Sequence, residues 1–279
     1  MGKIFWLASY PKSGNTWMRA FLHNLIHDKG GPLDVNAISK TALLDAGKRY
    51  YTPFTAKDPA TLDREEVAGM RPRVQAAMAA GKPGTVFVKT HTALTMLAGY
   101  PSHDPALTAG SLYIVRDPRD VVISYADHLG ISIDRAIAVM ATEDSQTDAS
   151  EKGVTEFIGS WSQNVTGWTG QAGATVMVVR YEDMLDKPKE TFGGVVRFLH
   201  LDRTSQMIRK AIENTRFDKL ARQEARDGFG ERSPKQHRFF RRGRAGGWRA
   251  KLSDDEAARI VADHGAVMRR FGYLNDGET

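Results

Sequence analysis

The stretch Ser9-Tyr10-Pro11-Lys12-Ser13-Gly14-Asn15-Thr16-Trp17 decides how this chain begins to fold. It follows the apolar run 4–8, whose length and composition predict a buried strand. It leads into 17–22, whose apolar spacing predicts a helix. A turn rich in Gly, Ser and Thr between a strand and a helix gathers backbone N–H groups at the helix N-terminus, where the dipole favours anions. The stretch therefore predicts a phosphate-binding loop in which Lys12 supplies a full charge. The alternative is a turn that only ends a strand.

The composition is that of an ordinary globular protein. The chain has 279 residues, of which 41% are hydrophobic and 26% charged, and it has no cysteine,. The lack of cysteine excludes disulfides, thiolate metal sites and a cysteine nucleophile. No apolar run approaches the length of a membrane span, and the run 4–8 is too short for a secretory signal. We therefore expect a cytoplasmic protein with a full hydrophobic core.

Strands and helices alternate along the chain. Short apolar runs predict buried strands at 3–9, 85–89, 111–115 and 175–180,. Apolar periodicity and capping residues predict helices at 16–27, 63–80, 118–129, 154–169, 189–199, 204–214 and 254–271,. This order predicts an α/β fold with a central parallel sheet flanked by helices, and ligands at the carboxyl edge of the strands.

Three segments lack strong periodicity, and we expect them to be mobile loops, near 30–60, 130–153 and 223–247, with part of 130–153 helical. We find no repeat and no domain boundary, so we expect one domain over 1–279. The net charge is +6. Much of the excess lies between residues 222 and 251, where ten basic residues oppose three acidic ones. Such a segment suits a polyanionic small ligand or a nucleic acid.

The phosphate loop differs from the Walker pattern G-x-x-x-x-G-K-[ST], because Lys12 stands two residues before Gly14 and no G-K-[ST] occurs,. It resembles Y-P-K-[SA]-G-[TN]-T-W, the first signature of the sulfotransferases that use 3′-phosphoadenosine 5′-phosphosulfate (PAPS). The resemblance implies a P-loop NTPase-like sulfotransferase fold. It also implies that the loop binds the nucleotide through Lys12, Ser13, Gly14, Asn15, Thr16 and Trp17.

A second motif is Val86-Phe87-Val88-Lys89-Thr90-His91, at the end of a predicted strand. Side chains at i and i+2 point to the same side of a strand, so Lys89 and His91 can face one pocket. A neutral histidine has a suitable pKa to accept a proton from a hydroxyl near pH 7. The alternative is a histidine that only bonds the backbone. K-T-H matches the position of the general base in the family, which implies a catalytic role for His91 with assistance from Lys89.

A third motif is Arg116-Asp117-Pro118-Arg119-Asp120, followed by Ser124. Pro118 suits the first turn of a helix. The string matches the family pattern R-[ND]-P-[RK]-D-x-x-x-S, which implies that Arg116 and Ser124 bind the 3′-phosphate. The planar guanidinium of Arg pairs two phosphate oxygens. We expect the other charged residues of the string to cap the helix.

The segment Phe239–Trp248 resembles the family's R-K-G-x-x-G segment, which folds over the 3′-phosphate. The resemblance implies nucleotide contacts by Phe239, Arg241, Arg242 and Gly243. The family usually has Asp where Gly247 stands, and its dimer motif is absent from 249–260. Other matches imply an adenine site made by Trp17, Tyr181, Thr215 and Phe217, although Trp17 and Phe217 suit a helix core equally well.

The four motifs together identify a PAPS-dependent sulfotransferase (EC 2.8.2 type). The implied reaction moves a sulfuryl group from PAPS to an acceptor hydroxyl and leaves 3′-phosphoadenosine 5′-phosphate (PAP). His91 takes the acceptor proton, Lys12 stabilises the developing charge, and no metal is needed. The alternatives are an ATP-dependent P-loop kinase of a small molecule and a basic nucleic-acid-binding module built on 222–251.

The acceptor is less defined than the donor. The motifs look more like those of bacterial sulfotransferases, including those acting on glycopeptide antibiotics, than those of animal hormone enzymes. We expect a small phenol or alcohol, with a carbohydrate or lipid left open, and no nucleic-acid or membrane partner. An apolar acceptor pocket made by Tyr50, Tyr51, Phe54, Met96 and Tyr100 is one possibility, and core packing explains these residues equally well. The oligomeric state stays open.

Overall fold

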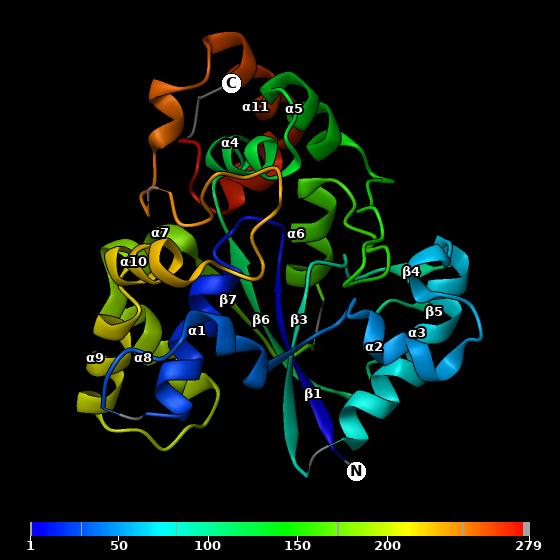
Figure 1. Ribbon diagram of the computed structural model, residues 1–279. Helices are drawn as coiled ribbons and strands as arrows, with labels where there is room; N and C mark the ends of the chain where they lie inside the picture. The colour runs from blue at the N-terminus through cyan, green and yellow to red at the C-terminus, as the bar shows by residue number, and fades with distance from the viewer. Residues whose placement is uncertain (1, 29, 82, 172, 242, 276–279) are drawn as a thin grey trace.

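At the centre of the computed structural model is a five-stranded sheet in which every strand pair is parallel (Figure 1). The structure describes residues 2–28, 30–81, 83–171, 173–241 and 243–275. The strand order is β2-β3-β1-β6-β7. The strands are β1 (Lys3–Ser9), β2 (Ala42–Leu44), β3 (Thr85–Thr90), β6 (Thr108–Val115) and β7 (Val176–Arg180). The order places β1, which leads into the phosphate loop, in the middle of the sheet.

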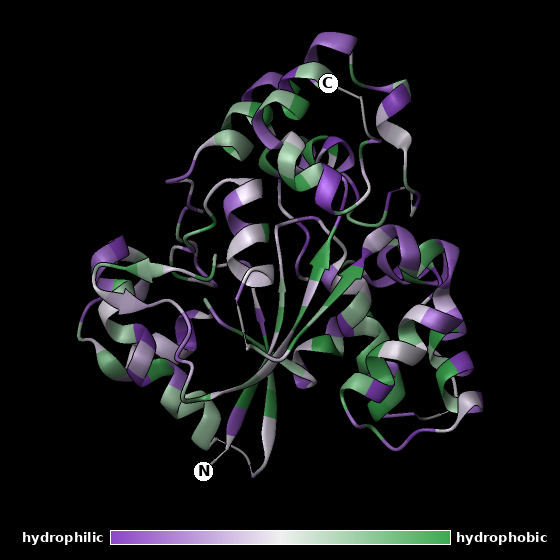
Figure 2. Ribbon diagram, turned by 180° about the vertical axis from the view of Figure 1, so that it is seen from behind, coloured by the Kyte–Doolittle hydropathy of each residue, from purple (hydrophilic) through white to green (hydrophobic). Residues whose placement is uncertain are grey.

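The middle strand packs against helices on both of its faces. Ile4, Trp6 and Ala8 point into one hydrophobic cluster, and Phe5 and Leu7 point into a second, as the alternation of side chains along a strand requires,. This burial on both faces explains the continuous apolar run of β1. Figure 2 shows the same arrangement, with hydrophobic strands at the centre and hydrophilic residues on the surrounding helices.

Helices on one face belong to the cluster around Phe5. They are α1 (Asn15–Ile26), α7 (Tyr181–Asp186), α8 (Pro188–Phe198) and α9 (Ser205–Asn214). The other cluster is built by α3 (Arg64–Ala80), α4 (Pro118–Leu129), α5 (Ile133–Ala141), α6 (Trp161–Thr169) and α11 (Asp254–Arg270). The remaining helices are α10 (Phe217–Asp227), the short α2 (Lys48–Tyr51) and the 3-10 turns η1 (Val35–Lys40), η2 (Thr52–Phe54), η3 (Pro59–Thr61) and η4 (Gly247–Ala250).

Most of the predicted elements are confirmed. The α4 prediction has the observed bounds, with Pro118 in the first turn and Asp117 capping it. The capping box of Ser253 and Glu256 begins α11 as predicted. Helix α6 starts at Trp161 rather than at 154, because Ser160 is its N-cap and Phe157 pairs with Gln146 in an extended bridge.

Several elements were missed, and they fall mainly in the segments predicted to be loops. Strand β2 has only three residues and pairs with β3 at the sheet edge. Helix α10 overlaps the start of 223–247. Helix α5 lies within 130–153, in agreement with the prediction that part of this segment is helical. A two-residue hairpin, β4 (Met96–Leu97) with β5 (Tyr100–Pro101), was also missed. The mobility of these segments stays a prediction.

Candidate active site

The phosphate loop joins the end of β1 to the start of α1. Gly14 has a φ of 105°, which is left-handed and favours glycine,. A Cβ on Gly14 would lie 2.6 Å from Cδ2 of Tyr181, so the close approach of this ring also requires glycine. The first hydrogen bond of α1 runs from the Trp17 N–H to the Gly14 carbonyl. The amides of Asn15 and Thr16 precede that bond and are placed as anion donors at a helix start.

The side chains of Asn15 and Thr16 are used inside the fold. The Asn15 Nδ2 donates to the Leu7 carbonyl at 2.9 Å, and its Oδ1 accepts from Arg19 Nε at 2.9 Å. The Thr16 Oγ1 accepts from Arg19 Nη2 at 3.1 Å. The prediction that Asn15 binds phosphate therefore depends on its backbone amide rather than on its side chain.

One cavity of about 900 Å³ connects the phosphate loop with the other predicted motifs. It lies at the carboxyl edge of the sheet, where β1, β3 and β6 end. Fourteen predicted site residues line it, namely Lys12, Gly14, Asn15, Thr16, Trp17, Lys89, His91, Arg116, Ser124, Tyr181, Phe217, Phe239, Arg241 and Gly243. Motifs up to 231 residues apart in sequence, from Lys12 to Gly243, therefore share one site.

Two predicted contact residues among those described are not brought to this cavity. Thr215 is fully buried, and its hydroxyl donates to the Ala211 carbonyl at 2.8 Å at the end of α9. Ser13 is fully buried within the loop. Neither belongs to the described lining of the cavity. The nucleotide contacts of Ser13 and Thr215 stay predictions. The predicted contact at Arg242 lies outside the described residues.

Lys12 is buried among other basic groups. Its Nζ lies 3.9 Å from the centroid of the Phe239 ring. This atom has no hydrogen-bond partner among the described residues. Burial, and secondarily the charge of Arg241, lowers the pKa of Lys12 to about 7,. The residue also has a φ of 66°, which is uncommon outside glycine,. An anion bound in the cavity would offset the cost of burying the charged amine of Lys12.

Arg116 comes from the end of β6 and reaches two other motifs. Its Nη1 donates to the Lys12 carbonyl at 3.2 Å, and its Nη2 donates to the Arg244 carbonyl at 3.4 Å. The guanidinium lies 4.2 Å from the centroid of the Tyr181 ring. Its buried Nε has no hydrogen-bond partner among the described residues. Arg116 thus links the phosphate loop to Arg244, in the segment between α10 and η4.

The basic segment, defined as residues 228–247, crosses the carboxyl end of the sheet between α10 and α4 (Figure 1, in yellow to orange). Two carboxylates hold it, Glu224, for which the sequence predicted no role, and Asp120, which was expected to cap α4, although Asp117 is the N-cap. Glu224 accepts from the amides of Phe239 and Phe240 at 2.7 and 2.8 Å. Asp120 accepts from the amides of Gly246 and Trp248 at 2.6 and 2.9 Å. Their charges orient this cation-rich segment toward the cavity.

Gly243 belongs to the same segment and has a φ of 55°. A Cβ there would lie 2.2 Å from the ring of Phe217. The glycine therefore allows the backbone to lie directly against this ring. Arg241 pairs with Asp127 at 3.2 Å, which fixes its head group beside α4.

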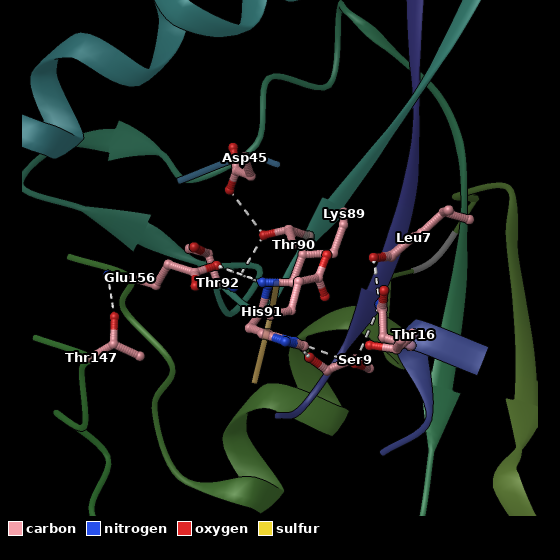
Figure 3. Close-up of polar contacts among 12 residues, drawn as sticks. Leu7, Ser9, Thr16, Asp45, Lys89, Thr90, His91, Thr92, Thr147 and Glu156 are labelled. Atoms are coloured by element: carbon pink, nitrogen blue, oxygen red, sulfur yellow. Dashed lines mark hydrogen bonds and ion pairs between the residues drawn. The ribbon is translucent and has the colours of Figure 1, made fainter. Parts of the chain in front are cut away.

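Residues 89–92, which contain the K-T-H motif, are named the catalytic turn after the role predicted for His91 (Figure 3). The His91 Nδ1–H donates to the Ser9 carbonyl at 2.8 Å. Because a carbonyl only accepts, this bond places the proton on Nδ1 and leaves Nε2 as the basic nitrogen. Burial, and next the charge of Lys89, holds the pKa of His91 well below its usual value,. His91 is therefore neutral at pH 7 and able to accept a proton.

A buried polar network supports the catalytic turn from the sheet edge. Asp45 Oδ2 accepts from Arg71 Nη2 at 2.7 Å and from the Thr90 hydroxyl at 2.9 Å. The Thr90 Oγ1 accepts in turn from the Thr92 amide at 3.1 Å. Arg71 and Asp45 are 2% and 1% exposed, so this ion pair is shielded from solvent and its geometry is restricted,.

Two further carboxylates near His91 were missed by the sequence analysis. Glu156 accepts from the His91 amide at 3.2 Å and lies 3.6 Å from Lys89 Nζ. Glu231 pairs with both terminal nitrogens of Arg19, at 2.8 and 2.6 Å. Although burial opposes it, this pairing lowers the pKa of Glu231 to about 2,. Neither residue belongs to one of the four motifs, so the sequence did not predict their contacts.

Core packing, the alternative to an apolar acceptor pocket, accounts for three of the five residues considered for that pocket. Tyr51 is fully buried in the core, and Tyr50 and Phe54 pack against the same cluster. Met96 and Tyr100 are exposed on the β4–β5 hairpin. None of the five belongs to the described lining of the cavity. Other residues of the cavity lining include Leu44, Leu129, Ile131 and Val139, together with Gln146, Thr147, Asp148, Glu156 and Glu231.

The described residues contain no group of three or more His, Cys, Asp or Glu side chains that could hold a metal ion. No helix within the described part of the chain is long and apolar enough to cross a membrane.

A phosphate loop, a second cluster of cations and a neutral histidine around one cavity define a nucleotide-dependent group transferase. The model of the sulfotransferase domain matches residues 3–272 of the chain. The chain therefore belongs to the PAPS-dependent sulfotransferase family. This finding replaces the two alternatives that the sequence left open, a kinase and a nucleic-acid-binding module, as the account of the four motifs.

Individual relatives are distant. Canine sulfotransferase 1A1 is 24% identical over 275 residues, which cover 95% of this chain and 83% of that protein. Cytosolic sulfotransferase 16 of Arabidopsis thaliana is 25% identical over 287 residues, covering 96% and 75% of the two chains.

Two solved structures share the fold. A retinol dehydratase in complex with androsterone and PAP has a TM-score of 0.65 at 19% identity and covers 95% of this chain and 80% of its own. Mouse sulfotransferase SULT7A1, complexed with PAP, has a TM-score of 0.61 at 18% identity and covers 96% and 85%. These likenesses confirm the predicted sulfotransferase fold.

Proposed function

We propose that this sulfotransferase moves a sulfuryl group from PAPS to a hydroxyl of a small molecule, with His91 as the general base. The observation that carries the proposal is the bond from His91 Nδ1 to the Ser9 carbonyl, at 2.8 Å, in the cavity that also holds the phosphate loop. It leaves the second ring nitrogen available as a base beside a nucleotide site.

The residues present fit a nucleotide with two phosphate groups. Lys12 Nζ and Arg116 Nε are buried without a hydrogen-bond partner among the described residues, as cations that await an anion would be,. Gly14 and Gly243 let the backbone lie directly against the rings of Tyr181 and Phe217, where a Cβ would collide with them. Lys12 and the backbone amides of Asn15 and Thr16 would bind the 5′-phosphate. The 3′-phosphate would be bound by Arg116, Ser124, Arg241 and Gly243. The PAP complexes of retinol dehydratase and mouse SULT7A1 support this assignment.

The adenine would lie among aromatic side chains that line the same cavity. Trp17 and Tyr181 pack edge to face at 5.9 Å, and Phe217 lies against Gly243. Stacking on aromatic rings suits a base, since each base has a flat apolar face. Phe239, above Lys12, would close the site over the phosphates.

When bound, PAPS supplies the sulfuryl group and a phosphate leaving group. His91 accepts the proton of the acceptor hydroxyl at Nε2 as the new O–S bond forms and the S–O bond to the phosphate breaks. Protonated Lys12 stabilises the negative charge that stays on the phosphate oxygen, and Lys89 adds a second positive charge beside the acceptor. Holding both reactants in line and neutralising charge is the main contribution of the protein to such a transfer.

The acceptor side of the cavity supports a small molecule with a hydroxyl and with both apolar and polar groups. Its lining alternates aliphatic side chains with amide, hydroxyl and carboxylate groups. An acceptor hydroxyl would be held by these polar groups, and its carbon skeleton by the aliphatic ones. The name of the Arabidopsis relative supports a cytoplasmic location.

The first test is calorimetric titration with PAP, ATP and AMP in the absence of magnesium. We expect PAP to bind at least about tenfold more tightly than AMP, since it alone brings the 3′-phosphate to Arg116. Equal binding of the three nucleotides would contradict the assignment. Acceptors would then be screened with PAPS by mass spectrometry, where an increase of one sulfuryl group identifies the product.

A further inference from the structure

We propose that Glu156 is a positioning residue of the transfer reaction, which holds Lys89 and His91 in their working arrangement. This inference rests on the proposed function, because it concerns the residue proposed there as the general base. It adds a residue that no motif of the chain contains.

The first argument is the geometry of the contacts. One oxygen of Glu156, Oε1, accepts from the His91 amide at 3.2 Å and lies 3.6 Å from Lys89 Nζ. Figure 3 shows this carboxylate beside the backbone of His91, while the ring extends to Ser9. His91 is thus held by Ser9 on β1 through the ring, and through the backbone by Glu156 and by Asn164, whose Nδ2 donates to the His91 carbonyl at 2.9 Å. Glu156 fixes the turn that aims the ring.

The second argument is that Glu156 is itself firmly placed. Its amide donates to Thr147 Oγ1 at 2.9 Å, and its carbonyl accepts from the Thr147 amide at 2.9 Å. The Thr155 hydroxyl donates to the Thr147 carbonyl at 2.7 Å. The carbonyl of the next residue, Phe157, accepts from the Ala93 amide at 2.9 Å. The carboxylate is only 12% exposed, so its position is set by the fold rather than by solvent,.

The third argument is electrostatic. The charged groups around His91 are Lys89 on β3, Arg19 on α1, Glu231 on the basic segment and Glu156, with Lys12 and His128 on the same cavity. Lys89 and Arg19 disfavour the imidazolium form of His91, and Glu231 favours it. Glu156 lies against Lys89 and offsets part of its charge. Without that offset, His91 becomes a weaker base.

The experiment compares Glu156→Gln with Glu156→Asp and with Glu151→Gln. The Gln variant keeps an oxygen for the His91 amide and loses the charge, and Asp keeps the charge on a shorter side chain. Glu151 is exposed on the same segment, so its variant is a control for an equal loss of charge elsewhere. The measurements are the His91 titration followed by NMR of the nucleotide-free protein, the pH profile of kcat/KM, and PAP binding.

For Glu156→Gln we expect the pKa of His91 and the acid limb of the pH profile to move to lower pH. We expect kcat to fall about tenfold, with the dissociation constant of PAP unchanged within about twofold. We expect Glu156→Asp to restore most of the pKa and rate, and Glu151→Gln to resemble the original protein.

Two results would overturn the inference. One is an unshifted His91 titration in Glu156→Gln, whatever the effect on kcat. The other is an equal shift in the Glu151→Gln control, which would show a general effect of net charge. The NMR titration needs no acceptor, so it decides the inference even if no transfer is found. A failure of the proposed function would instead appear in the original protein, as a lack of transfer or of selective PAP binding.

Discussion

The charged groups at the two ends of the cavity differ in whether they have partners within the protein. At the nucleotide end, buried nitrogens of Lys12 and Arg116 have no hydrogen-bond partner among the described residues. At the catalytic turn, Lys89 faces Glu156, His91 bonds Ser9, and Arg71 pairs with Asp45. A buried cation without a partner is unfavourable until an anion arrives, whereas a paired group keeps one geometry. The first end is suited to binding a polyanion and the second to positioning a reaction.

The largest expected effect comes from the positioning end. We expect His91→Ala to lower kcat by about 10³-fold, because general-base catalysis contributes about 10²–10⁴-fold. PAP affinity should stay within about twofold, since His91 belongs to the catalytic turn rather than to the phosphate loop. The measurement is steady-state transfer of radiolabelled sulfate together with PAP calorimetry. A parallel loss of PAP binding would mean that His91 is structural.

The next effect comes from the binding end. We expect Arg116→Ala to weaken PAP by about 2 kcal/mol, roughly thirtyfold, because a charge-assisted hydrogen bond to phosphate is lost. AMP has no 3′-phosphate, so its binding should change little. Calorimetry with both nucleotides checks the prediction. If AMP weakened by the same factor, Arg116 would act through the Lys12 carbonyl, to which it donates.

A third prediction concerns protons. The pKa of Lys12 is about 7 in the nucleotide-free protein, and a bound phosphate raises it,. Binding of PAP at pH 8 should therefore take up as much as about one proton, and affinity should fall by up to about tenfold per pH unit above pH 7. Below pH 6 Lys12 is already protonated, and its contribution to proton uptake should vanish.

Calorimetry in buffers of different ionisation enthalpy measures this uptake, and Lys12→Met is the control that removes the titrating group. The difference between the two proteins isolates Lys12 from the ionisation of PAP itself. An equal proton uptake by both proteins at pH 8 would show that Lys12 is already charged before the nucleotide binds.

The smallest expected effect tests a residue that belongs to neither end. Thr215→Val should leave PAP binding unchanged within about twofold, because the Thr215 side chain is buried against α9. The lost hydrogen bond should lower the free energy of unfolding by about 1 kcal/mol. Calorimetry and urea unfolding measure the two quantities. Weaker PAP binding by about tenfold would show that Thr215 reaches the adenine after all.

The elements that were predicted correctly have strong local signals. The apolar run of β1, the proline in the first turn of α4 and the capping box of α11 each depend on neighbouring residues. Strand β2 and helix α10 were missed for the opposite reason. Three residues of β2 gain their hydrogen bonds only from β3, and α10 is strongly polar, with few buried residues,.

The basic segment shows why a charge count alone was ambiguous. Several of its cations are already engaged, since Arg241 pairs with Asp127 and Arg232 donates to the carbonyls of Gln236 and His237. The carboxylates Glu224 and Asp120 direct the backbone of the segment toward the cavity. Its excess charge therefore serves a defined pocket in this fold, a role that net charge cannot distinguish from an extended basic surface.

By itself, the sequence determined the parallel α/β fold, the phosphate loop and the motifs that end at the carboxyl edge of the sheet. It could do so because strand periodicity, glycine conformation and motif spacing are local properties. Only the tertiary structure decided which side chains face the cavity, that Thr215 is buried, and that Glu156 and Glu231 stand beside His91. Those outcomes depend on contacts between segments far apart in the chain, such as Arg19 with Glu231, for which the sequence carries no periodic signal.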